Sequence, residues 1–245
     1  MSRAAIPSVS SGSASVSKGI VGAFRSRGRI PCPNAGPGRS CRRRRTLRFR
    51  SVTPSRDDAW ELFCEWTESD SLRKHVLGVE AAMRAYAREY GEDEELWAVT
   101  GIVHDLDYER YPDLETGHPR KALEELRQLD YPEEVIDAVA GHATFLSVPR
   151  TTRMAKALYA VDELSGFVAA CALVRPTGIH GMTPKSVKKK LNQPSFAASV
   201  NREEVREAAE ELGVDFDEHV RRVIAAMEER AAELGLEGEA APAGG

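Results

Sequence analysis

Residues 96–108 read LWAVTGIVHDLDY, an apolar run that ends in the doublet His104-Asp105. The apolar half of this run is typical of a buried helix, so we expect the doublet to lie inside the protein. A buried carboxylate beside a buried imidazole is costly unless hydrogen bonds or a cation compensate its charge. The rest of the sequence therefore has to supply the compensating groups.

Further imidazole and carboxylate side chains fall on inward positions of neighbouring predicted helices, and these are His75, His118, His142 and Asp162. Asp162 is the most informative of them, because no Lys or Arg stands one helical turn away at positions 158, 159, 165 or 166. Imidazoles and carboxylates are common ligands of transition metals, and six exceed what one zinc ion usually takes from protein. The pattern therefore predicts a centre of two divalent ions, with Asp105 between them.

The remaining sequence has the 3.6-residue period of amphipathic helices, and no convincing run alternates with period 2, so we predict an all-α fold. A first helix is expected to begin at Ser55. The later helices are expected over about 71–90, 93–104, from 116 or 117 to 129, 132–142, 152–174, 183–191, 201–213 and 215–234.

Composition divides the chain into four segments. Residues 1–56 carry a net charge of +13 and the remaining residues one of −17. We expect a disordered basic N-terminal segment over 1–54, a metal-binding helical domain over 55–176, a C-terminal helical extension packed on it over 177–236, and a flexible tail over 237–245. The basic segment fits a solvated tail or translated upstream sequence, which favours a cytoplasmic protein. It also fits a transit peptide, which would place the protein in an organelle.

Several partners are disfavoured by the same composition. An acidic body does not suggest nucleic-acid binding, because phosphate backbones need positive counter-charge. No stretch of 18 apolar residues exists, so no membrane-spanning segment is expected. The four cysteines have no CxxC spacing, and we expect free thiols in a reducing compartment. The oligomeric state is not indicated by the sequence.

The order His75, His104-Asp105 and Asp162 resembles the motif of the HD-domain superfamily of metal-dependent phosphohydrolases, near its HDIG members. The resemblance covers about residues 70–175 and implies an HD-domain helical bundle with bound divalent metal. Mn, Fe, Mg, Zn and Ni are not distinguished by these ligands.

Two further features refine this resemblance. His118 and His142 look like the additional histidines of two-metal members. The chain reads HDLDY where many members read HDIGK, so a lysine often found near substrate phosphate is missing. We interpret Asp107, which is part of this departure, as a residue that supports a ligand. The GYP motif of members that cleave cyclic di-GMP is absent, which disfavours that substrate.

The resemblance implies a hydrolase of phosphate esters, either a phosphomonoesterase or a phosphodiesterase, acting on a small phosphorylated or nucleotide substrate. A metal-bound hydroxide would attack phosphorus, with His104 and Asp105 at the catalytic centre. The expected substrate-binding cations are Arg73, Lys74 and Lys185. Two alternatives remain open: a di-iron oxygenase of the inositol-oxygenase-like branch, which has a similar ligand order, and a non-catalytic ligand-sensing helical module.

Overall fold

The computed structural model describes residues 30, 32 and 54–239, and this described part consists of helices and loops without a strand. The prediction of an all-α fold is confirmed. Most residues of the segment 1–54, for which disorder or a targeting role was predicted, and most of the predicted flexible tail lie outside the described residues. Within the described range, no helix combines the length and the apolar character needed to cross a membrane.

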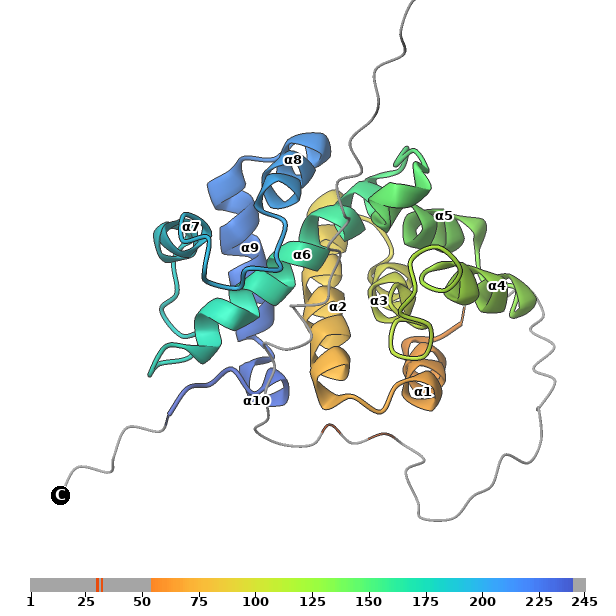
Figure 1. Ribbon diagram of the computed structural model, residues 1–245, viewed down its shortest axis with the longest axis horizontal. Coiled ribbons are helices and arrows are strands. Elements are labelled where there is room, and N and C mark those ends of the chain that lie inside the picture. Colours follow the sequence, from red (N-terminus) through yellow and green to blue (C-terminus); the bar gives the residue numbers. More distant parts are fainter. Residues whose placement is uncertain (1–29, 31, 33–53, 240–245) are drawn as a thin grey trace, which may run out of the picture.

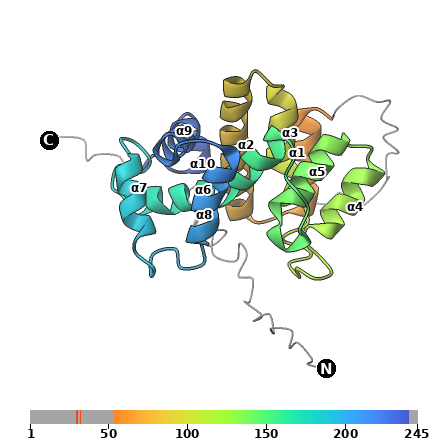
Figure 2. The ribbon, with the colours of Figure 1, turned by 90° about the horizontal axis from the view of Figure 1, so that it is seen from above.

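Figure 1 shows α6 running diagonally through the middle of the molecule, with α1 to α5 toward the right and α7 to α10 toward the left. Figure 2, seen from above, shows the same division with α2 and α6 at the centre. The helices are α1 (Arg56–Trp66), α2 (Asp70–Tyr90), α3 (Glu94–Val103), α4 (Arg120–Gln128), α5 (Glu133–His142), the 3-10 turn η1 (Thr144–Leu146), α6 (Arg153–Leu173), α7 (Pro184–Leu191), α8 (Arg202–Leu212), α9 (Phe216–Glu228) and α10 (Ala231–Leu234).

The two central helices, α2 and α6, have clear start signals. The Ser69 hydroxyl accepts the N–H of Leu72 at the start of α2, and the Thr152 hydroxyl accepts the N–H of Ala155 at the start of α6. Almost every residue of α6 is buried, which agrees with its apolar composition on all sides. These two helices therefore form the frame on which the others pack.

Close packing of α2 against α3 depends on Gly101. A Cβ atom at this position would lie 3.0 Å from the Cα atom of Glu80 and 3.1 Å from its backbone nitrogen. Because backbone atoms cannot move aside as a flexible side chain does, a larger residue would push the two helices apart. The glycine thus allows the end of α3, which carries the His-Asp doublet, to approach α2.

The structure corrects two helix boundaries. The fourth helix was expected to begin at Thr116 or Gly117, but α4 begins at Arg120 and leaves His118 in the preceding loop. Thr116 instead donates its N–H to the carboxylate of Asp113, so it belongs to a local turn. The last predicted helix, 215–234, is divided into α9 and α10, with Arg230 between them.

The expectation of free thiols is wrong for two cysteines. Cys32 and Cys64 form a disulfide with their Cα atoms 6.0 Å apart, and Ile30 nearby is buried in the core. Pairing across 32 positions depends on how the chain returns to α1, which the spacing of the cysteines does not reveal. Cys171 is a buried free thiol, and Cys41 lies outside the described residues.

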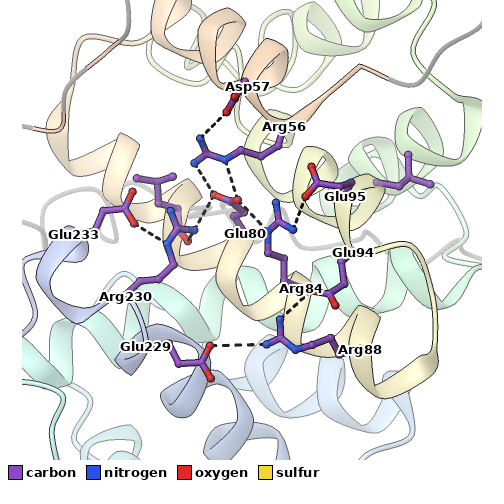
Figure 3. Close-up of polar contacts among 12 residues, drawn as sticks. Arg56, Asp57, Glu80, Arg84, Arg88, Glu94, Glu95, Glu229, Arg230 and Glu233 are labelled. Atoms are coloured by element: carbon purple, nitrogen blue, oxygen red, sulfur yellow. Dashed lines mark hydrogen bonds and ion pairs between the residues drawn. The ribbon is translucent and has the colours of Figure 1, made fainter.

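A buried ion cluster joins α1 and α2 to Arg230, which lies between α9 and α10, and Figure 3 shows it around the Glu80 carboxylate. Arg56 donates to both oxygens of Glu80 at 3.0 Å, Arg84 donates to Oε1 at 3.2 Å, and Arg230 donates to Oε2 at 2.8 Å. Burial alone would raise the pKa of Glu80, but Arg56 and Arg230 lower it below its usual value. This carboxylate is therefore compensated entirely by cations that the chain provides.

Candidate metal centre

The six predicted ligands come from separate parts of the chain and meet in the interior. Each of them is at most 8% exposed. They are His75 in the second turn of α2, His104 at the end of α3, Asp105 in the following turn, His118 in the loop before α4, His142 as the last residue of α5, and Asp162 in the middle of α6.

One group of ligands gathers around the Asp162 carboxylate. The Oδ1 atom of Asp162 lies 3.0 Å from His75 Nε2 and 3.5 Å from His104 Nε2. The Oδ2 atom of Asp105 lies 3.7 Å from His75 Nε2 and 3.5 Å from His104 Nε2. Two imidazoles and two carboxylate oxygens therefore face one another within the reach of a single ion.

A second group uses the other oxygen of Asp105. Its Oδ1 atom lies 3.6 Å from His118 Nε2 and 3.7 Å from His142 Nε2. Asp105, His118 and His142 form one buried triad in which the potential ligand atoms all lie within 4.8 Å of one another, and His75, His104 and Asp105 form another. Asp105 is common to both triads and turns one oxygen toward each.

Local hydrogen bonds orient three of the four imidazoles. His104 Nδ1 donates to the Gly101 carbonyl at 2.8 Å, and His142 Nδ1 donates to the Val139 carbonyl at 2.5 Å. Both histidines stand at the end of a helix, where the last carbonyl groups lack partners within the helix. When Nδ1 carries the proton, Nε2 of the neutral ring presents its lone pair to the centre, as a metal ligand must.

Asp107 orients the third imidazole. Its Oδ1 accepts a hydrogen bond from His118 Nδ1 at 2.8 Å, and its Oδ2 accepts the backbone N–H of Ala122 at 2.8 Å. The carboxylate thus fixes the His118 ring and also caps the start of α4. This geometry agrees with the interpretation of Asp107 as a residue that supports a ligand, rather than as a ligand itself.

The charges at the centre fit a cation. In the described part of the chain, the ion-pair partners of Asp105 and Asp162 are histidines, without a Lys or an Arg. Burial opposes a charge on His104, but Asp105 and Asp162 raise its pKa to about 9. His104 Nε2 is fully buried without a hydrogen-bond partner. A divalent cation that replaces the Nε2 proton would bind this nitrogen and balance both carboxylates.

Two further residues, Glu163 and Tyr108, lie beside the centre, and neither is among the predicted site residues. Glu163 follows Asp162 and is only 7% exposed, and burial together with Asp162, Glu204 and Asp105 raises its pKa to about 9. The signal used for Asp162 would have found it, because positions 159, 160, 166 and 167 also lack a cation. Tyr108 packs its buried ring edge-on against His118, with centroids 5.1 Å apart.

The predicted substrate-binding cations lie in different places. Arg73 donates to the Thr67 carbonyl and pairs with Asp70, and Lys185 is exposed on α7. Lys74 is buried in α2, and burial lowers its pKa. The structure thus does not bring these three side chains together as one cluster, and their role in binding a substrate stays a prediction.

The two histidines outside the centre have ordinary partners. His180 pairs with Glu228 on the surface. His219 is fully buried, and its ring contacts the Tyr86 hydroxyl at 2.6 Å and the Ala160 carbonyl at 3.0 Å.

Comparison with known proteins gives one match. The family model described as HD domain matches residues 72–166, a segment that runs from α2 into α6. All six candidate ligands lie inside this segment, whereas α7 to α10 lie beyond it. No curated protein and no solved structure gives a significant match to the chain.

Proposed function

Residues 72–166 of this chain belong to the HD-domain superfamily, whose members are generally metal-dependent hydrolases, and on that premise we propose that the protein hydrolyses phosphate esters. The substrate in this proposal is a small phosphorylated compound or a nucleotide. The cleaved bond is that of a phosphomonoester or a phosphodiester.

The observation that carries the proposal is the position of Asp105. One carboxylate oxygen faces His75 and His104, and the other faces His118 and His142. A carboxylate shared in this way suits two neighbouring divalent ions, an arrangement common among enzymes that cleave phosphate esters. With Asp162 beside the first pair of imidazoles, the ligand set has no missing member.

The protein's own groups prepare the centre. His75, His104 and Asp162 would hold one ion, His118 and His142 the other, and Asp105 both. Bound divalent ions there would activate water and neutralise charge on phosphoryl oxygens. The Nδ1 hydrogen bonds of His104, His118 and His142 keep their Nε2 atoms aimed inward. All six side chains are buried, and the low-dielectric surroundings strengthen each electrostatic contact between them.

The test starts from the metal-loaded full chain. Bound metals are measured by mass spectrometry, and hydrolysis of p-nitrophenyl phosphate and bis-p-nitrophenyl phosphate is followed with added Mn²⁺. We expect turnover by the wild type and its loss, together with bound metal, in Asp105→Ala and His104→Ala. A matched control is Asp137→Asn, which changes an exposed carboxylate on α5 and should keep both metal and turnover.

Two other results would replace the proposal. Oxygen consumption by the iron-loaded protein, without cleavage of either ester, would identify an oxygenase. A full complement of metal with neither activity would indicate a ligand-sensing module. A protein that binds no metal, or binds it without a fixed number of ions per chain, would contradict all three functions.

A further inference from the structure

Glu163 has a buried carboxylate oxygen without a partner. Its Oε2 atom is inaccessible to solvent and makes no hydrogen bond within the described residues, although the side chain is only 7% exposed. In the same described range, Glu163 makes no ion pair with Lys or Arg. A buried acceptor in this condition is costly, and such groups usually have a partner in the functional state.

The position of Glu163 places this acceptor at the metal centre. It follows Asp162 on α6, and its carboxyl group interacts electrostatically with Asp162, Glu204 and Asp105. Tyr108, whose ring contacts His118, interacts with Asp105, Asp162 and Glu163. Glu163 and Tyr108 therefore both lie beside the centre, Glu163 next to Asp162 and Tyr108 next to His118.

The C-terminal helices bring a second carboxylate close to Glu163. Glu204 lies in the first turn of α8, and the Thr144 hydroxyl donates to its Oε1 atom at 3.4 Å. Thr144 is two residues after His142, so the contact joins α8 to the end of a ligand-bearing helix. Arg150 strengthens this connection because it binds Glu211 of α8 at 2.7 Å and the Gly141 carbonyl at 2.8 Å.

Two carboxyl groups beside a metal centre select for hydrogen-bond donors. Carboxylate oxygens accept hydrogen bonds, and even a protonated carboxyl keeps an acceptor oxygen. Beside Glu204 a second phosphate group on the substrate would meet a negative neighbour, whereas a hydroxyl or ammonium group would find an acceptor at either carboxyl group. Metal ions would thus favour the phosphoryl half of the substrate, and the two carboxyl groups would favour its other half.

Resting on the proposed function, we propose that Glu163 and Glu204 form a substrate-recognition wall that binds hydroxyl or ammonium groups on the non-phosphoryl half of a phosphorylated substrate. Glu163 belongs to the segment that matches the HD domain, and Glu204 belongs to the C-terminal helices outside it. Substrate choice in this protein therefore depends on helices beyond the matched segment.

The test measures binding to the Mn²⁺-loaded full chain by isothermal titration calorimetry. Three probes share one phosphoryl group: glycerol 1-phosphate carries hydroxyls, phosphoethanolamine carries an ammonium group, and propyl phosphate carries neither. We expect the wild type to bind at least one of the first two about 10-fold more tightly than propyl phosphate, as hydrogen bonds to charged groups allow.

Variants separate the two kinds of donor. Glu163→Met removes both acceptor oxygens and should abolish the preference, so that all three probes bind about equally. The amount of Mn²⁺ bound at saturation should not change. Glu163→Gln keeps one acceptor oxygen but cannot carry a negative charge. If the variant still prefers a probe over propyl phosphate, the preference is for hydroxyl groups. If the preference is lost, it is for the ammonium group. Glu204→Gln should also change the preference among the probes, and because this position is half-buried the substitution carries little risk to folding. The control is Glu210→Gln, an exposed site on the same helix.

The outcomes distinguish this proposal from the proposed function. A wild type that cleaves the esters but binds all three probes equally overturns the wall and leaves the hydrolase standing. A preference that Glu163→Met abolishes, in a protein that cleaves no ester, supports the wall and overturns the hydrolase. A preference unchanged in Glu163→Met and in Glu204→Gln, or no binding of any probe, overturns the wall.

Discussion

The molecule buries carboxylates in two places and compensates them in two ways. Glu80 is surrounded by Arg56, Arg84 and Arg230, so its counter-charges belong to the chain and are present whenever it is folded. Asp105 and Asp162 face histidines instead. A cluster that supplies its own cations serves structure. A cluster without strong cations is left to recruit one from solution, which indicates a binding site.

The largest expected effect comes from removing the carboxylate shared by the two metal positions. Asp105→Asn should reduce turnover by about a thousandfold or more, because several kcal/mol of charge stabilisation by the ions is lost. In the wild type, free metal at a thousand times its Kd should raise the free energy of unfolding by about 4 kcal/mol. In the variant this increase should vanish, as measured by urea unfolding with and without chelator. An equal increase in the variant would show that Asp105 does not bind the ions.

The contribution of the Glu80 cluster to stability should be independent of metal. Glu80→Gln leaves three partly buried guanidinium groups around a neutral amide, and we expect the free energy of unfolding to fall by about 3 kcal/mol. The loss should be the same with and without chelator, and the bound metal per chain should not change. Loss of metal from a folded Glu80→Gln protein would show that the two clusters are not independent.

His219 tests a third means of burying a titratable group, in which the group is kept neutral. Burial lowers the pKa of His219 to about 4, from an ordinary value of 6.5. A depressed histidine pKa gives stability that is complete above pH 6.5 and is lost as the pH falls toward 4. The loss is about 2 kcal/mol at pH 5.

This loss can be isolated with one variant. The difference in unfolding free energy between wild type and His219→Gln should shrink by that amount between pH 7 and pH 5. The measurement uses the chelated proteins, so that release of metal does not contribute. A difference that stays constant over this range would mean that His219 titrates normally in the folded protein.

The smallest effect is expected from the group that orients His118. Asp107→Asn leaves the ligands in place but no longer holds the Nδ1 proton of His118 with a charged acceptor. Support of this kind is usually worth 10-fold to 100-fold in metal affinity. We therefore expect weaker binding of one ion by about that factor and little change for the other, measured by titration with Mn²⁺. An equal loss of affinity for both ions would contradict the assignment of His118 to one metal position.

Prediction from the sequence was most successful where periodic patterns are strong. The stripe that contains His75 and the apolar length of 152–174 predict long buried helices, and α2 and α6 are those helices. It was least successful at the start of α4. Asp107, fifteen positions away in sequence, caps that helix through Ala122, and a local capping pattern at Thr116 does not reveal this.

The predicted ligands illustrate the same limit. Residue type and helical spacing identified six inward side chains, but not that Asp105 turns a different oxygen toward each pair of histidines. The sequence likewise did not reveal the pairing of Cys32 with Cys64, because contact across a long loop depends on the path of the chain. Glu80 was missed because two of its arginine partners, Arg56 and Arg230, are far from it in sequence.

The amino-acid sequence by itself determined the helical class and the choice of side chains that enter the interior, because both follow from local periodicity and from residue chemistry. Only the tertiary structure decided which buried acids receive an arginine and which remain available to a metal ion. It also decided that Glu204 of α8 lies near Asp162. Electrostatic compensation depends on distances in space, and those distances are set by how the helices pack rather than by their order along the chain.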